Sequence, residues 1–156
     1  MRKNHIYLAG PFFNEQQCRI LDAVQEALQK NATVGEIFSP SKWQGAKDLA
    51  FGSTEWKQKT FLADIRQIDR CDAVVAIADY TVLEGETLPD SGTTFEMGYA
   101  YATNKPLIIV HAEDMNKLNL MLLEAQTSIQ SIDTLANYDF NTLHPNIEME
   151  QKLEVF

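Results

Sequence analysis

The chain alternates between short apolar runs and longer segments in which apolar residues recur at helical spacing. The short runs predict five strands, at residues 5–9, 34–38, 72–78, 107–110 and 128–132. The run at residues 72–78 is apolar throughout after its first residue. Such a run is typical of a parallel strand that is covered on both faces.

Helices are predicted between these strands. The first begins at about Asn14, a good N-cap residue. Further helices are predicted at residues 56–70 and 94–104, with a short one at 119–125, whereas residues 41–55 and the acidic segment 81–91 are expected to be loops. This alternation predicts an α/β fold with a mostly parallel sheet and helices on both faces.

Ligands of such sheets bind at the carboxyl ends of the strands, where the strand order reverses. The segments that follow the strands are therefore the places to search for chemistry. They are residues 10–13, the loop after Phe38, residues 79–94 and the loop after Val110.

The composition is that of an ordinary globular protein, and the 156 residues suit one domain, 1–156. Cys18 and Cys71 form neither a metal-ligand spacing nor a disulfide framework, which favours a reducing compartment and a cytoplasmic protein. We identify no signal peptide and no membrane-spanning run. The net charge of −9 disfavours a nucleic-acid polymer as partner and favours a neutral substrate.

The strongest local signal is the segment D-S-G-T-T-F-E-M-G-Y-A at residues 90–100. A glycine turn enters a helix there, and Glu96 is expected in the first turn, where backbone N–H groups and the helix dipole favour an ionised carboxylate. An ionised carboxylate at a strand end suits the nucleophile of a retaining glycosyl transfer. By itself, the position is more often that of a carboxylate that only stabilises a helix start.

Further candidate residues lie in the first predicted strand, in the turn after it, at the start of the third predicted strand, and before the helix that carries Glu96. Tyr7 could orient Glu96 by a hydrogen bond, and the aromatic residues after Gly10 could stack on a heterocycle or fill the core. Asp72 and Asp90 add two acidic groups that could protonate or hold a leaving base, although an Asp at a strand start is often only a solvated group.

Several other kinds of site are not indicated. His5, His111 and His144 are scattered and match no metal motif. Ser53 and Ser91 lack the strand–turn–helix context of a nucleophile elbow, and there is no dinucleotide fingerprint or phosphate-binding loop. We expect no metal and no organic cofactor.

Four motifs in order, taken together, resemble one known family. They are I-Y-L-A-G-P-F-F (6–13), C-D-A-V-V-A (71–76), D-S-G-T-T-F-E-M-G-Y-A (90–100) and N-L-M (119–121). With this spacing the chain is similar to the nucleoside 2-deoxyribosyltransferases from residue 6 to about 123. The resemblance implies a flavodoxin-like three-layer sandwich with a five-stranded parallel sheet. It also implies a nucleotide-salvage enzyme that exchanges nucleobases on 2′-deoxyribonucleosides.

The resemblance also implies roles for individual residues. Glu96 would attack C1′ of the sugar to form a covalent deoxyribosyl ester, and attack by a second base would complete the exchange with retention. Tyr7 matches the tyrosine that orients this nucleophile. Asp72 and Asp90 match the aspartates that hold and protonate the base.

Other residues match the substrate-binding part of the family site. Gly10 lies in the turn after the first strand, Phe13 matches an aromatic pocket residue, and Gln44 lies in the loop on the base side. Asn119 and Met121 match residues that a neighbouring subunit contributes, since the family forms hexamers built as trimers of dimers. The family's terminal carboxylate can reach a neighbour's site, although this chain ends in Phe rather than Tyr.

Departures from the pattern bear on specificity. Gly10-Pro11-Phe12 replaces a G-x-G-W type turn of some members and favours purine bases. The bulk and negative charge of residues 12–15 disfavour the phosphate pocket of the related nucleotide N-glycosidases. Two alternatives stay open: a deoxynucleoside or nucleotide N-glycoside hydrolase with water as acceptor, and a non-catalytic nucleoside-binding module on the same fold.

Overall fold

The centre of the protein is a five-stranded, entirely parallel sheet. The computed structural model describes residues 1–78, 80–83, 86–112 and 117–156. The sheet has the order β2-β1-β3-β6-β8. Its strands are β1 (Asn4–Ala9), β2 (Val34–Phe38), β3 (Ala73–Ile77), β6 (Leu107–His111) and β8 (Ser128–Ser131). All five predicted strands are confirmed, and the order is that of a flavodoxin-like sheet, with its switch point between β1 and β3.

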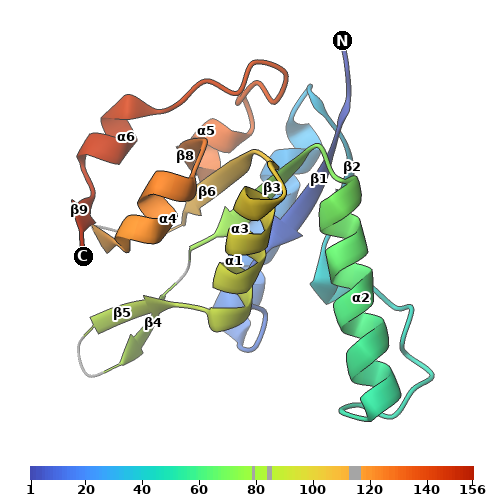
Figure 1. The fold of residues 1–156 in the computed structure, drawn as a ribbon. Helices are drawn as coiled ribbons and strands as arrows, with labels where there is room; N and C mark the ends of the chain where they lie inside the picture. Colours follow the sequence, from blue (N-terminus) through green and yellow to red (C-terminus); the bar gives the residue numbers. More distant parts are fainter. Residues whose placement is uncertain (79, 84–85, 113–116) are drawn as a thin grey trace.

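Helices cover both faces of this sheet, as Figure 1 shows. On one face, α1 (Glu15–Lys30) packs with Ile6 and Leu8 of β1 in one core, and α5 (Ile132–Leu135) lies beside α1 over β6 and β8. On the other face, α2 (Thr54–Arg70) and α3 (Ser91–Ala102) pack in one core with Tyr7 and Ala9, and α4 (Leu120–Ala125) lies beside α3. Because alternate residues of a strand point to opposite faces, β1 contributes to both cores. The predicted three-layer sandwich is confirmed.

Polar side chains start the helices. Asn14 caps α1 by accepting a hydrogen bond from the Gln17 N–H, as predicted. Ser53 caps α2 in the same way, so that this helix begins two residues before the predicted Trp56. Asp90 caps α3, which begins at Ser91 rather than at Thr94. The sequence interpretation missed this start because it assigned Gly92 to a turn.

Three regions contain more regular structure than the sequence predicted. Part of the expected loop at residues 81–91 pairs as an antiparallel ribbon, β4 (Tyr80–Leu83) with β5 (Glu86–Pro89). A 3₁₀ helix, η1 (Pro40–Lys42), opens the expected loop 41–55. Near the C-terminus, α6 (Ile147–Gln151) precedes β9 (Glu154–Val155), which pairs in parallel with β7 (Lys117–Leu118). Two-residue strands carry no periodicity, so only their pairing reveals them.

Three parts of the predicted ligand-binding edge lie outside the described residues. These are Asp79, which closes the predicted third strand, residues 84–85 in the acidic segment, and residues 113–116 in the loop after β6. Among the helices of the described ranges, none is long and apolar enough to cross a membrane.

Candidate active site

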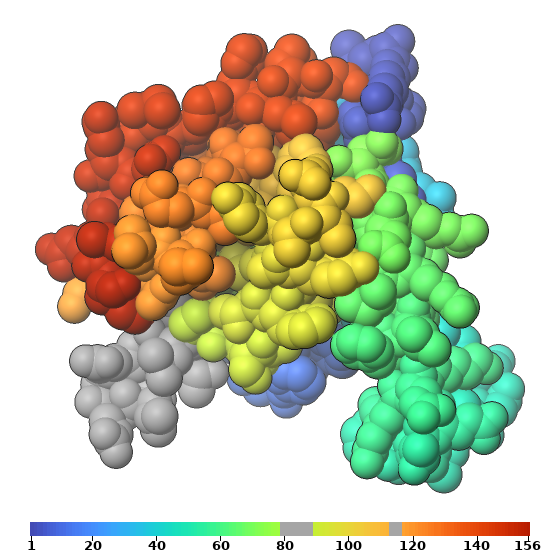
Figure 2. All heavy atoms as spheres, in the orientation of Figure 1, coloured from blue at the N-terminus to red at the C-terminus, as the bar shows by residue number. Residues whose placement is uncertain are grey.

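A cavity of about 550 Å³ opens at the carboxyl edge of the sheet. Its walls come from the turn after β1, the segment after β2, the first half of α2 and the start of α3. The space-filling view shows the corresponding hollow between the lower end of α3 and the lower end of α2 with its preceding loop (Figure 2). This volume lies within the range of roughly 300–1,000 Å³ that is usual for small-molecule sites.

Glu96 lies on the wall of this cavity, and Tyr7 contacts it from the buried side, outside the lining residues. The Tyr7 hydroxyl donates a hydrogen bond of 2.6 Å to Glu96 Oε1. Tyr7 is fully buried on β1, and its ring stacks on Phe38 with 5.6 Å between the ring centroids. Packing therefore fixes the donor, and Glu96 is held over the sheet face at a defined place.

The pKa of Glu96 differs from the low value that was expected at a helix start. Burial raises its pKa to about 7, the Tyr7 hydrogen bond opposes this rise, and the nearby Asp64 and Asp90 add to it. Glu96 lies in the second turn of α3, beyond the first-turn N–H groups that were expected to stabilise its anion. Burial and the Glu96 carboxylate also raise the pKa of Tyr7, so the phenol keeps its proton and acts as the donor.

Asp64 is an acidic wall residue that the sequence interpretation missed. It lies on α2, its Oδ1 is buried without a hydrogen-bond partner in the described part of the chain, and burial raises its pKa to about 6. A signal for it was available, since Asp64 precedes the fully buried Ile68 by four residues and so shares the sheet-facing stripe of the helix. A carboxylate at such a position is costly unless it serves a ligand.

The structure separates the two aspartates that were predicted from sequence. Asp90 lines the cavity, and its Oδ2 accepts hydrogen bonds from the Thr93 N–H (2.7 Å) and Oγ1 (2.8 Å). Asp72 precedes β3 at the amino edge of the sheet, where its carboxylate accepts the His5 N–H (2.9 Å) and pairs with Arg2. Parallel strands bring only their carboxyl ends to this cavity, so Asp72 is not brought to it.

Three predicted binding residues, Gly10, Phe13 and Gln44, lie on the cavity wall. A Cβ atom at Gly10 would come within 3.0 Å of Ile77 Cδ1, so the close packing of this turn favours glycine. The sequence interpretation missed further wall residues, namely Trp43, Lys47, Phe51, Trp56 and Thr60. Phe51 and Trp56 contact each other with 4.6 Å between ring centroids, and Phe51 is 87% exposed beside an open cavity. Aromatic faces presented in this way suit a flat heterocyclic ligand.

Comparisons with known proteins agree with this geometry. The sequence model of the family described as nucleoside 2-deoxyribosyltransferase matches residues 6–151. The chain belongs to the nucleoside 2-deoxyribosyltransferase family. The expectation of an enzyme of the pentosyltransferase class is thereby confirmed at the level of the family.

Individual relatives support the family assignment. A nucleoside deoxyribosyltransferase from Limosilactobacillus fermentum is 30% identical, with 97% of this chain and 94% of the relative covered. The solved structure of a 2-deoxyribosyltransferase from Bacillus psychrosaccharolyticus superposes with a TM-score of 0.79 at 29% identity, covering 91% of this chain and 97% of that one. A conserved protein from Enterococcus faecalis shares the fold, with a TM-score of 0.56 at 21% identity over 99% of this chain and 91% of its own.

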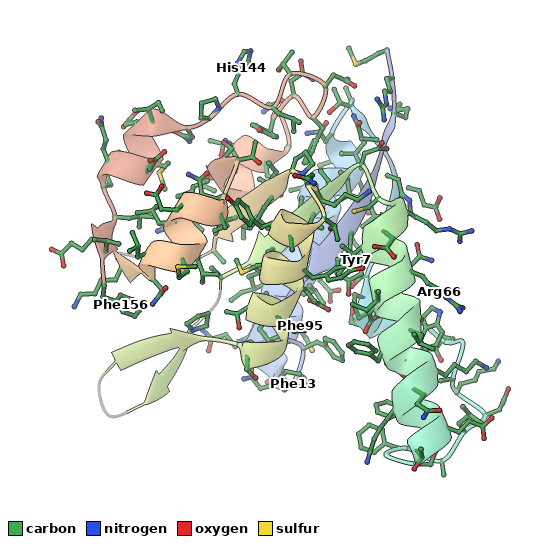
Figure 3. All side chains as sticks on the ribbon, viewed as in Figure 1. Tyr7, Phe13, Arg66, Phe95, His144 and Phe156 are labelled. Carbon is green, nitrogen blue, oxygen red and sulfur yellow. The ribbon has the colours of Figure 1, made fainter. Side chains whose placement is uncertain are left out.

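In this deoxyribosyltransferase-family chain, Asn119 and Met121 do not line the cavity of their own chain. They begin α4, where the Asn119 side chain accepts the Met121 N–H and Met121 is 75% exposed. The terminal Phe156 lies beside them, because its backbone oxygen accepts the Leu120 N–H at 3.0 Å. Figure 3 shows Phe156 on the other side of α3 from Tyr7 and from Arg66 of α2. Asn119, Met121 and Phe156, the three groups predicted to reach a neighbouring subunit, therefore lie together at one corner of the surface.

Proposed function

We propose that this chain transfers 2-deoxyribose between nucleobases through a covalent intermediate on Glu96. The observation that carries this proposal is the 2.6 Å hydrogen bond from Tyr7 to Glu96 at the wall of a nucleoside-sized cavity. A buried phenol that holds one oxygen of a carboxylate orients the other for attack. Such an arrangement suits a nucleophile better than a simple binding group.

The first half-reaction breaks the glycosidic bond. Oε2 of ionised Glu96 attacks C1′, a C1′–O bond forms, and the C1′–N bond breaks with its electron pair leaving on the base. A proton reaches that nitrogen from Asp64, which lines the cavity and whose buried Oδ1 has no hydrogen-bond partner among the described residues. Asp64 thus takes the part that sequence resemblance gave to Asp72, and Asp90 holds the substrate as an acceptor.

The second half-reaction reverses these steps with another base. A nitrogen lone pair of the incoming base attacks C1′, the ester C1′–O bond breaks, and its electron pair returns to Glu96. The proton of the incoming N–H passes to Asp64. Two displacements on opposite sides of C1′ retain the configuration of the nucleoside.

The cavity walls support a purine base as the preferred occupant. Phe13, Trp43, Phe51 and Trp56 offer aromatic faces for a bicyclic ring, and Gln44 offers both a donor and an acceptor for its edge. Asp64, Asp90 and Glu96 make the cavity acidic, which disfavours a phosphorylated substrate.

A second copy of the chain completes the site in this proposal. Exposed large apolar side chains lie on α2, α3 and α4, namely Phe61, Leu62, Phe95, Tyr101, Leu120 and Met121. The Phe61 and Phe95 rings contact each other with 6.0 Å between centroids, so α2 and α3 contribute to one apolar surface. Surfaces of this kind mark protein interfaces. Pairing through them would present Asn119, Met121 and the Phe156 carboxylate to a neighbour, in a hexamer arranged as a trimer of dimers.

The biological setting follows from the chemistry. We infer one catalytic domain over residues 1–156 that serves nucleotide salvage, since base exchange consumes free nucleobases. The thiols of Cys18 and Cys71 are both free, which suits a reducing cytoplasm.

A product assay with two donors tests the function. The protein is incubated with deoxyinosine and adenine, and in parallel with thymidine and adenine, and the products are separated by chromatography. We expect deoxyadenosine from deoxyinosine, and its formation from thymidine as well would indicate a broad base range. Free base and deoxyribose without a new nucleoside would make the protein a hydrolase. If Glu96→Gln retained turnover, the mechanism would be wrong, whereas loss of turnover with nucleoside binding kept would exclude a binding module.

A further inference from the structure

The start of α3 joins an acidic wall residue to a buried hydroxyl. Thr93 is 2% exposed and lines the cavity together with Asp90. Its backbone N–H and its Oγ1 both donate to the same oxygen, Asp90 Oδ2, at 2.7 and 2.8 Å. A Cβ atom at Gly92 would lie 3.3 Å from this oxygen, so the turn packs closely around it.

This arrangement exceeds the needs of a helix cap. An N-cap requires one acceptor for a backbone N–H, and the Thr93 N–H already provides that contact. The additional hydroxyl bond restrains rotation of the carboxylate about its last side-chain torsion. With Oδ2 engaged by two donors, the orientation of Oδ1 is determined as well.

Thr93 is also close to the candidate nucleophile. It precedes Glu96 by three residues, and such pairs share one face of a helix. Phe95, labelled on the lower part of α3 in Figure 3, marks the stretch of helix that carries both residues. The Asp90 carboxylate is near enough to Glu96 to act on its charge. The orientation of the Asp90 carboxylate is therefore set close to the carboxylate that is proposed to attack the substrate.

We propose that Thr93 is a positioning residue, whose hydroxyl holds Asp90 Oδ2 so that Oδ1 accepts a hydrogen bond from the bound nucleoside. This role rests on the proposed function, because it acts on the substrate through Asp90. The partner on the substrate is an N–H or O–H group, since an ionised carboxylate only accepts. Thr93 itself does not touch the reacting atoms.

Two substitutions at Thr93 separate the hydroxyl from the shape of the side chain. Thr93→Val keeps the branched shape and removes the donor, and Thr93→Ser keeps the donor and removes a methyl group. For release of hypoxanthine from deoxyinosine, we expect Thr93→Val to lower kcat/KM about tenfold, the effect of one hydrogen bond to a charged group. Thr93→Ser should stay within about threefold of the wild type.

Thr94 provides a matched control in the same helical turn. Its Oγ1 donates to the Ser91 carbonyl at 2.9 Å, and Thr94 is not part of the cavity wall. Thr94→Val should therefore leave kcat/KM within about twofold of the wild type while removing a comparable hydroxyl. Thermal unfolding of both valine variants would measure any effect on the helix itself.

A double-mutant cycle tests whether Thr93 acts through Asp90. In an Asp90→Ala background, Thr93→Val should lower kcat/KM by less than about twofold, because the side chain that it positions is gone. An equal loss in both backgrounds would overturn the proposal and assign Thr93 a structural role. So would an unchanged Asp90 orientation in a crystal structure of Thr93→Val.

The outcomes also separate this role from the proposed function. If the wild type releases the base and Thr93→Val releases it equally well, only the role of Thr93 is overturned. Absence of base release and transfer by the wild type would overturn the proposed function, and the role of Thr93 with it.

Discussion

Replacing Tyr7 with Phe tests the central pair of the site directly. The substitution removes the hydroxyl that donates to Glu96 Oε1 at 2.6 Å and keeps the ring that stacks on Phe38. A hydrogen bond to a charged group contributes about 1.5–3 kcal/mol. If that contribution is expressed in the orientation of the nucleophile, kcat for base release should fall about 10- to 150-fold.

The same substitution should change the pH dependence in a defined direction. Attack requires ionised Glu96, so the rate rises as the pH passes its pKa of about 7. The Tyr7 hydrogen bond lowers this pKa, and its loss in Tyr7→Phe should move the midpoint of the rise to higher pH. The rate of Tyr7→Phe relative to the wild type should therefore be lowest in acidic buffer and recover partly towards alkaline pH, where loss of the Asp64 proton slows both proteins alike.

The assay measures kcat/KM for base release from deoxyinosine between about pH 5 and pH 9, where the midpoint reports the free enzyme. Thermal unfolding of the variant serves as the control for folding. An unchanged rate, or a midpoint that moves to lower pH, would refute the reasoning that Tyr7 orients and stabilises the Glu96 anion.

Three further predictions follow from buried polar groups. Folding raises the Glu96 pKa from 4.5 to about 7, so the wild type loses stability as the pH rises through that window. Glu96→Gln lacks this titration. Between pH 4 and pH 8, its free energy of unfolding in urea should therefore rise by up to about 3 kcal/mol relative to that of the wild type. Asp64→Asn should lower kcat for base release about 10²- to 10⁴-fold, because it removes the proton donor. The control Asp72→Asn, at the opposite edge of the sheet, should stay within about twofold of the wild type. Equal losses in the two variants would contradict the assignment of Asp64 as the donor. Asn31→Ala should lower the free energy of unfolding by about 3 kcal/mol or more. Asn31 is 3% exposed, and its Nδ2 donates to two buried backbone carbonyl groups in and after α5. A loss below about 1 kcal/mol in urea denaturation would contradict this prediction.

The sequence by itself determined most of the architecture. Short runs rich in apolar residues predicted the five strands of the sheet, most clearly at β3, because a parallel strand covered on both faces must be apolar along its length. Asn14 located the start of α1, since a side-chain acceptor is needed where the first helical N–H groups have no partner. The pairing of Tyr7 with Glu96 was also foreseen, by family resemblance combined with the expected strand and helix.

Tertiary structure alone decided which carboxylates meet. Asp72 and Asp64 are only eight positions apart in the chain. However, the direction of β3 leaves Asp72 at the amino edge, whereas the face of α2 that packs on the sheet carries Asp64 to the cavity wall. Nothing in a linear motif specifies the edge of the sheet to which a side chain points once the strands are assembled.

The charge of Glu96 and the corner near the C-terminus depended on tertiary structure for the same reason. Helix position alone favoured an ionised Glu96, but burial against Tyr7 and proximity to two other carboxylates raise its pKa to about 7. The pairing of β9 with β7 places Phe156 beside Asn119 and Met121, which are 37 and 35 positions away in the sequence. Desolvation and long-range pairing arise from what surrounds a residue in space, and local sequence does not encode those surroundings.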